Sequence, residues 1–236
     1  DQEEVAKIVA RYDILAVPVV DDTNQLVGIV TVDDIIDIIR EEATEDILKM
    51  AGVGGEEFIE TQSVFRSTRI RLPWLSASCI GGIVAFFIIG HYEGSLSKFA
   101  YLAAFIPVIM GMGGNIGTQT STIVVRGLAT GRLNIRDTWS VVFKEFAIGF
   151  ILGMVYGFLV GSVAQLRYSM FQVAISVGIA VISSMSIAAL VGSLVPMGFA
   201  KINIDPAIAS GPFVTTAIDI ISVAFYFIIA TTLLGI

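Results

Sequence analysis

Charged residues are scarce in this chain, and cysteine is nearly absent. Only 15% of the residues are charged, against roughly 25% in soluble domains, so the composition excludes an ordinary soluble protein. Cys79 is the sole cysteine, which excludes an intrachain disulfide and says nothing about redox compartment. No apolar stretch long enough to span a membrane precedes Leu72, so we expect no cleaved secretory signal.

The few charges are divided unequally along the chain. Residues 1–62 hold 16 acidic and 4 basic residues, a net charge of −12, whereas residues 63–236 hold 5 acidic and 10 basic residues, a net charge of +5. Hydrophobic residues make up 55% of the whole, and the mean hydropathy is +0.84. An acidic, water-facing segment is therefore expected to precede a mildly basic membrane segment.

Five hydrophobic stretches follow Arg71, each with the roughly 20 residues that a helix needs to cross the hydrocarbon core. The expected fold is an α-helical polytopic membrane protein with five transmembrane helices, preceded by a partial α/β unit and an amphipathic connecting helix. Basic residues gather on one side of these stretches, which predicts a cytoplasmic N-terminus and an extracytoplasmic C-terminus. The predicted spans are 72–90, 99–125, 138–165, 170–197 and 206–236.

The first forty residues have the pattern of a small α/β unit. Helical spacing over 2–12, followed by β-branched runs at 16–20 and 26–30 around a polar turn, predicts a helix and a hairpin. Thr31 is predicted to cap a further helix over 32–40.

The run AVPVVDDTNQLVGIVTVDDIIDII resembles the C-terminal half of a CBS motif. In that family the element Gly28 to Thr31 with Asp34 contacts the ribose of an adenine nucleotide, so the resemblance implies half of such a site. A helix cap with a solvated acidic face is the alternative interpretation.

Ten carboxylates gather between Asp33 and Glu60, with Arg40 and Lys49 as the only bases among them. The run lacks the spacing of an EF-hand loop, and a solvated helix face is its ordinary interpretation. Close like charges repel, however, and a divalent cation that bridges them would relieve the repulsion. A cation sensor is the functional alternative.

The second hydrophobic stretch is rich in glycine and polar residues. Dense glycine in a membrane helix indicates either close helix packing or a backbone that lines a cavity, and both explanations stay open. Asn115 and Gln119 lie four residues apart and so share one helix face. We assign this polar face to an ion path.

Asp219 is the only charged residue between Ala207 and Ile236. A carboxylate near the bilayer centre costs roughly 2.5 to 3.5 kcal/mol on insertion scales, and it usually faces water, a partner or a cation. One helix stripe carries four polar side chains, Thr215, Asp219, Ser222 and Tyr226. A structural ion pair is the alternative, with Lys144 as the nearest basic residue, but we favour cation transport.

A single carboxylate also predicts an assembly. One Asp219 cannot neutralise a divalent cation, whereas two copies related by a two-fold axis can, and such homodimers are the commonest oligomers. Mg²⁺ dehydrates reluctantly and keeps several waters, so a hydrated ion held by one carboxylate from each chain suits it well. We therefore predict a homodimer with a Mg²⁺ path on or near its axis.

Together with the half CBS motif, three segments resemble the MgtE family of magnesium channels: RSTRIRLPWL, PVIMGMGGNIGTQTSTIVVRGLA and DPAIASGPFVTTAIDIIS. The resemblance implies a homodimeric, Mg²⁺-selective channel for passive uptake across the plasma membrane, and not an enzyme. It implies that Asp219 binds hydrated Mg²⁺ in the pore, that Gly111 and Asn115 lie near the cytoplasmic pore entrance, and that Thr215 lies near the ion. With Gln119 and Ser222 from the polar stripes, these residues form the predicted pore lining.

The resemblance also implies a cytosolic gate. A connecting helix over 56–69 would plug the pore when Mg²⁺ binds acidic residues, and Asp33, Glu57 and Glu60 are the predicted sensor ligands. Family members usually carry an acidic helical N domain and two CBS motifs, most of which this chain lacks. The predicted parts are a partial CBS domain over 1–48, an acidic linker and connecting helix over 49–71, and a pore domain over 72–236.

A secondary transporter coupled to Na⁺ or H⁺ is the alternative function, because Asp219 could itself titrate. An intramembrane aspartyl protease would need a second membrane carboxylate, and the other acids beyond residue 92 lie near the ends of the predicted spans. The expected partners are a second copy of the chain, membrane lipid and an adenine nucleotide at the CBS region, with no nucleic acid.

Overall fold

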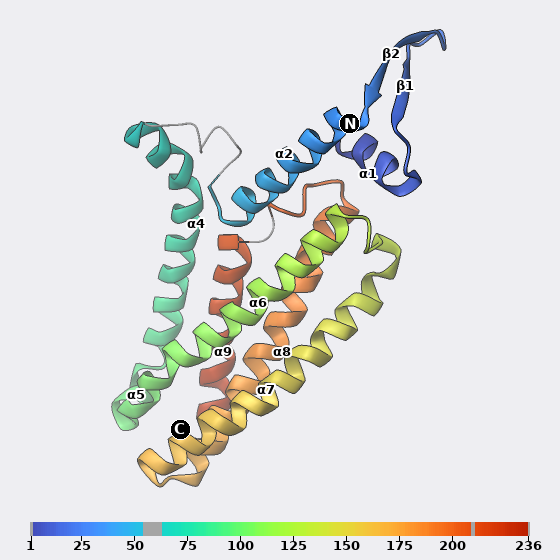
Figure 1. The fold of residues 1–236 in the computed structure, drawn as a ribbon. Coiled ribbons are helices and arrows are strands. Elements are labelled where there is room, and N and C mark those ends of the chain that lie inside the picture. Colours follow the sequence, from blue (N-terminus) through green and yellow to red (C-terminus); the bar gives the residue numbers. More distant parts are fainter. Residues whose placement is uncertain (1, 54–62, 209–210, 236) are drawn as a thin grey trace. The chain divides into compact units, whose positions relative to one another are not determined.

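The computed structural model describes residues 2–53, 63–208 and 211–235, and the chain divides into two compact units, Asp1–Ile70 and Arg71–Ile236 (Figure 1). Each unit is built on its own core. A small cluster of Ala6, Val9 and Ile35 holds the first unit together, whereas the core of the second unit is drawn from several long helices.

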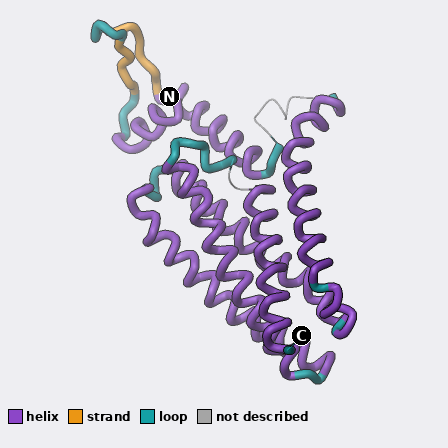
Figure 2. Tube along the Cα trace, turned by 180° about the vertical axis from the view of Figure 1, so that it is seen from behind, coloured by secondary structure: helices purple, strands orange, loops and turns teal. Residues whose placement is uncertain are grey.

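In residues 2–53 of the first unit, two helices flank a two-stranded sheet, whose strands are orange in Figure 2. Strand β1 (Ala16–Val20) pairs antiparallel with β2 (Leu26–Thr31), and the register shifts between Val19 and Val20. Helix α1 (Gln2–Tyr12) precedes the hairpin and α2 (Val32–Met50) follows it, and the two helices pack against each other. The helix and hairpin predicted from the sequence are confirmed.

Helix α2 begins at Val32, as predicted, but it is longer than predicted and its N-terminus is capped differently. It continues to Met50 rather than stopping at Arg40, and an ion pair of 2.6 Å between Lys49 and Glu45 lies in its last turns. Thr31 stands at the N-cap position with extended backbone, but no backbone N–H donates to its side chain. The hydroxyl instead donates to Asp34 Oδ2 at 3.1 Å, so the predicted capping bond is wrong.

The part of the chain that the structure describes contains five helical segments long and apolar enough to cross a membrane, as predicted. These spans are Val64–His91, Ala100–Ala129, Ile135–Tyr168, Phe171–Lys201 and Gly211–Leu234. Their elements are α4 (Val64–His91), α5 (Glu93–Lys98), the short 3₁₀ helix Ala100–Phe105, α6 (Ile106–Ala129), a 3₁₀ turn (Ile135–Asp137), α7 (Thr138–Tyr168), α8 (Phe171–Lys201) and α9 (Gly211–Leu234).

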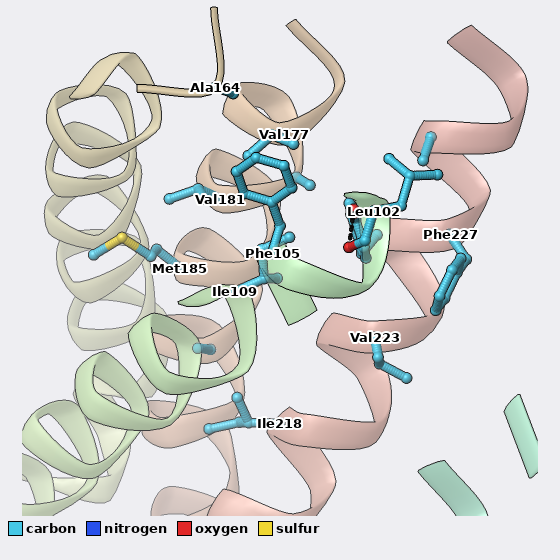
Figure 3. Packing of buried hydrophobic residues seen from close by; sticks show 14 of the residues in the cluster. Leu102, Phe105, Ile109, Ala164, Val177, Val181, Met185, Ile218, Val223 and Phe227 are labelled. Carbon is cyan, nitrogen blue, oxygen red and sulfur yellow. Dashed lines mark hydrogen bonds between the residues drawn. The ribbon is translucent and has the colours of Figure 1, made fainter. Parts of the chain in front are cut away.

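Helix α8 forms the centre of the second unit and packs against α6, α7 and α9 (Figure 1). Of the five spans, α8 has the largest buried share. Figure 3 shows how Val177, Val181 and Met185 of α8 meet Ile109 of α6, with Ile218 of α9 close by. The bundle therefore holds α6 and α9 in fixed register through a shared neighbour.

Helix α4 lies at the edge of the second unit. Its only buried residues are Gly81 and Ala85, and Cys79 is exposed on its surface. The helix begins at Val64 and runs through Pro73 without interruption. The end of the predicted connecting helix is thus continuous with the first span, while residues 54–62 lie outside the described residues.

Small residues allow α7 and α8 to approach backbone to backbone. Gly149, Gly153, Gly157 and Gly161 recur every four residues along the buried face of α7. A Cβ atom added to Gly157 would lie 2.6 Å from the carbonyl oxygen of Gly178 in α8. Packing by small residues is the usual way in which membrane helices associate, because lipid provides no hydrophobic driving force between them.

Candidate cation site in the membrane helices

Asp219 lies about two turns into α9, which begins at Gly211 with a φ of 42°. Its side chain is partly exposed, and within the described residues its carboxylate makes no hydrogen bond or ion pair. The predicted alternative, a structural ion pair with Lys144, is therefore not formed. One carboxylate oxygen lies 3.9 Å from the position that a Cβ atom on Gly114 of α6 would occupy.

The surface of α6 next to Asp219 is polar although it belongs to a membrane span. The side chains of Asn115, Thr118, Gln119 and Thr122 are all exposed in the single chain. Lipid tails offer no hydrogen bonds to such groups, so this face needs water or another protein surface against it. The described chain thus presents a polar strip and a free carboxylate on adjoining helices.

The sequence left two roles open for the α6 glycines, close helix packing and lining a cavity. Different glycines have surroundings that suit each role. Gly113 and Gly117 are buried, and Gly117 packs against Ile218 and the backbone of Ala188. Gly111 is exposed, and Gly114 lies beneath the Asp219 carboxylate. Close packing and an open polar face therefore occur on opposite sides of the same helix.

Ser222 is placed differently from Asp219, although both fall on the predicted stripe. Its side chain is 2% exposed, and its hydroxyl lies 2.7 Å from that of Ser184 in α8. Ser184 also lies 3.1 Å from the carbonyl oxygen of Ile109, to which it can donate. A Cβ atom on Gly113 would lie only 2.5 Å from the Ser184 hydroxyl. The Ser222 hydroxyl therefore links α8 and α9 inside the bundle, whereas the Asp219 side chain is partly exposed.

Thr215 is partly exposed one turn before Asp219, and its hydroxyl lies 3.2 Å from the carbonyl oxygen of Gly211 in the same helix. One turn beyond Ser222, Tyr226 is fully buried and donates to the Leu102 carbonyl oxygen at 2.8 Å. The stripe therefore runs from the surface at Thr215 and Asp219 into the core at Ser222 and Tyr226.

Glu145 is a membrane carboxylate whose burial the sequence analysis missed. It is 4% exposed, and Thr120 of α6 donates to its Oε2 at 3.3 Å. A signal for this burial was present, because Glu145 stands four residues before Gly149 and extends the buried glycine stripe of α7 by one turn.

Comparison with known proteins now gives the family. Residues 106–229 match the MgtE family model, described as a divalent cation transporter, and this match covers more than half of the chain. The chain belongs to the MgtE family. Residues 1–41 match the CBS domain model. The family description names a transporter and not an enzyme class.

Three curated relatives are each named magnesium transporter MgtE. The proteins of Bacillus subtilis and Enterococcus faecalis are both 40% identical over 98% of this chain, and that of Thermus thermophilus is 37% identical over 99%. The chain spans about half the length of these relatives, 51% of the first two and 52% of the third.

The predicted cytoplasmic residues of this MgtE family chain are open to solvent. Gly28, Asp33 and Asp34 are exposed, and Thr31 is partly exposed, so nucleotide binding at Gly28, Thr31 and Asp34 stays a prediction. Within the described residues no group of three or more His, Cys, Asp or Glu side chains surrounds Asp33 or any other position. The other predicted sensor ligands, Glu57 and Glu60, lie outside the described residues.

Acidic side chains nonetheless crowd one another in the CBS part of this MgtE chain. Partial burial raises the pKa of Glu42 in α2 above its usual value, and repulsion from Glu3 in α1 and from Glu45 raises it further. The two helices thus bring like charges together, and ion pairs of Lys7 with Glu3 at 2.8 Å and of Lys49 with Glu45 at 2.6 Å balance part of that charge.

Proposed function

We propose that this chain forms the pore of a Mg²⁺-selective channel for passive divalent cation uptake across the plasma membrane. The observation that carries the proposal is the Asp219 carboxylate, free of any protein partner in the described chain, beside the exposed polar face of α6. An ionised group within a membrane span is a functional site by default, because its insertion is costly. The family match to a divalent cation transporter, and three relatives named as magnesium transporters, support the choice of ion.

The pore requires a second copy of the chain. One Asp219 contributes a single negative charge, whereas two copies across a two-fold axis balance a divalent cation. The same arrangement covers Asn115 and Gln119, whose side-chain amides lipid would leave without hydrogen bonds. Between two such faces a Mg²⁺ ion would keep several of its waters, as it commonly does in proteins.

The membrane potential supplies enough free energy for uptake. When the cytoplasm is negative by about 100 mV, two positive charges that enter it gain about 4.6 kcal/mol. No coupled ion is therefore required.

Flux through the purified chain in liposomes tests this proposal. With Na⁺ and pH equal on both sides, an inside-negative K⁺ diffusion potential should drive Mg²⁺ entry, reported by an internal Mg²⁺-sensitive dye. Liposomes without protein control for leakage. If entry requires an imposed Na⁺ or H⁺ gradient, the alternative secondary transporter replaces the channel.

We further propose that cytosolic Mg²⁺ closes the pore by bridging acidic residues of the first unit and its linker. The acid crowding around Glu42 supports the presence of such surfaces. In this proposal Asp33, Glu57 and Glu60 act together, and the segment that follows them leads directly into α4.

Neutralising Glu57 and Glu60 together should leave conduction intact and shift closure to higher cytosolic Mg²⁺. Each substitution removes one proposed ligand of the bridge, and both positions precede the first membrane span, Val64–His91. The measurement is Mg²⁺-dependent inhibition of liposome flux by Glu57→Gln/Glu60→Gln. Glu4→Gln/Asp22→Asn is the charge-matched control, and an unchanged midpoint in the Glu57/Glu60 variant would assign these acids to a solvated surface.

A further inference from the structure

The buried carboxylate of Glu145 has no part in the proposed pore. It lies inside the bundle between α7 and α6, whereas Asp219 faces Gly114. Thr120, which contacts Glu145, is six residues from Gly114, a separation of about 9 Å along α6. A single ion therefore cannot be shared by the two carboxylates.

The Glu145 carboxylate also lacks a basic partner. Within the described residues it forms no ion pair, and its one hydrogen bond is the 3.3 Å bond from Thr120. A buried carboxylate that is neither paired nor well hydrogen-bonded is strongly disfavoured, so Glu145 must either bind a proton or have a positive charge beside it.

Two neighbouring hydroxyls of α6 are not used by their own helix. Elsewhere in the bundle, Ser186 and Ser193 donate to the carbonyl oxygen four residues earlier, as is common for serine in helices. Thr120 instead donates to Glu145, and the hydroxyl of Ser121, which is 1% exposed, has no hydrogen-bond partner in the described chain. A buried hydroxyl without a partner indicates a missing ligand or water.

Helix α8 contains a carbonyl oxygen that lacks its usual donor in the same helix. Pro196 has no N–H to donate to the carbonyl oxygen of Gly192, one turn earlier in α8. Gly192 packs on Gly117, which stands one turn before Ser121 on α6. On the other side, Gly149 of α7, one turn after Glu145, packs against α8. These contacts bring α8 against α6 at Gly117 and against α7 at Gly149, each within about one turn of the Thr120–Glu145 pair.

We propose that Glu145, Thr120 and Ser121 form a second cation site inside the bundle, which binds one small monovalent cation such as Na⁺. One carboxylate balances one positive charge, and hydroxyl and carbonyl oxygens are suitable ligands for a hard cation. A divalent ion would leave a buried positive charge unbalanced, and Mg²⁺ would need several waters. The site is independent of the proposed Mg²⁺ pore, and its occupation would stabilise the contact of α6 with α7.

Thermal unfolding of the purified chain in detergent tests this site without any measurement of transport. Na⁺ is titrated against N-methylglucamine at constant ionic strength and pH, with no Mg²⁺ present. A ligand bound only by the folded state raises the melting temperature by mass action. We expect a saturable rise with Na⁺, which is lost in Glu145→Gln and retained in Asp219→Asn.

The hydroxyl variants sharpen the test. Ser121→Ala and Thr120→Val should move the midpoint of the rise to higher Na⁺. Thr118→Val is the matched control on the same helix, because the exposed Thr118 hydroxyl bonds to its own backbone at Gly114. Its midpoint should equal that of the unchanged chain.

Three results would overturn the proposal: no rise with Na⁺, an equal rise in Glu145→Gln, or a rise that follows falling pH and ignores Na⁺. If Glu145→Gln does not fold, equilibrium binding of ²²Na⁺ to the unchanged chain and to Ser121→Ala decides. One ion per chain with weaker binding in Ser121→Ala supports the site, and the absence of binding refutes it.

Discussion

Replacing Asp219 with asparagine is expected to abolish Mg²⁺ flux while the helix bundle still folds. The carboxylate makes no bond within the described chain, so its charge contributes nothing to packing that the amide would lose. At an effective dielectric constant of about 20, two unit charges about 4 Å apart attract each other by about 4 kcal/mol, so the loss of ion affinity should be about 700-fold. Dye-reported liposome flux measures the effect.

The control for this variant is Glu93→Gln, which removes one carboxylate from α5, outside the membrane spans. It should conduct like the unchanged chain. Size-exclusion chromatography and thermal unfolding should give the same result for Asp219→Asn as for the parent. Normal flux in Asp219→Asn would refute the pore assignment, and loss of folding would show that the carboxylate is structural.

Introducing alanine at Gly192 should destabilise the bundle strongly. Its Cβ atom would lie 2.6 Å from the carbonyl oxygen and 3.2 Å from the Cα atom of Gly117, and backbone atoms cannot rotate away as a side chain can. Overpacking of this kind costs about 1–3 kcal/mol. For a chain of this size the melting temperature should fall by about 3–10 °C, as measured by thermal unfolding in detergent.

Gly198→Ala is the matched control, because it lies on the same helix and a Cβ atom there would have no neighbour within 4 Å. Its melting temperature should equal that of the parent or exceed it slightly, since alanine favours helix more than glycine does. Equal stability of the two variants would show that α6 and α8 do not pack this closely.

Hydropathy was sufficient to predict the five spans, because each is a long apolar run and no tertiary information is needed to find it. The polar face of α6 was also predictable, since Asn115 and Gln119 follow the helical period. The sequence could not show which neighbour covers each face. Asp219 and Ser222 share a stripe, yet only contact with Ser184 distinguishes the buried hydroxyl from the open carboxylate.

The same limit explains why the burial of Glu145 cannot be predicted from its place near the end of a predicted span. Its position along α7 was correctly judged, but its burial depends on glycines that bring α8 against that face. The role of Thr31 was missed for a different reason, because Asp34 competes for its hydroxyl within a single turn.

The lone thiol of Cys79 provides a reporter that needs no engineering. It is exposed on α4, at the margin of the bundle, and the sequence offers no second cysteine to react. A nitroxide attached there labels each chain once, so any dipolar coupling between labels comes from two different chains. Such spectra would reveal whether subunits pair, and a change in the label distance between low and high Mg²⁺ would follow α4 directly in lipid.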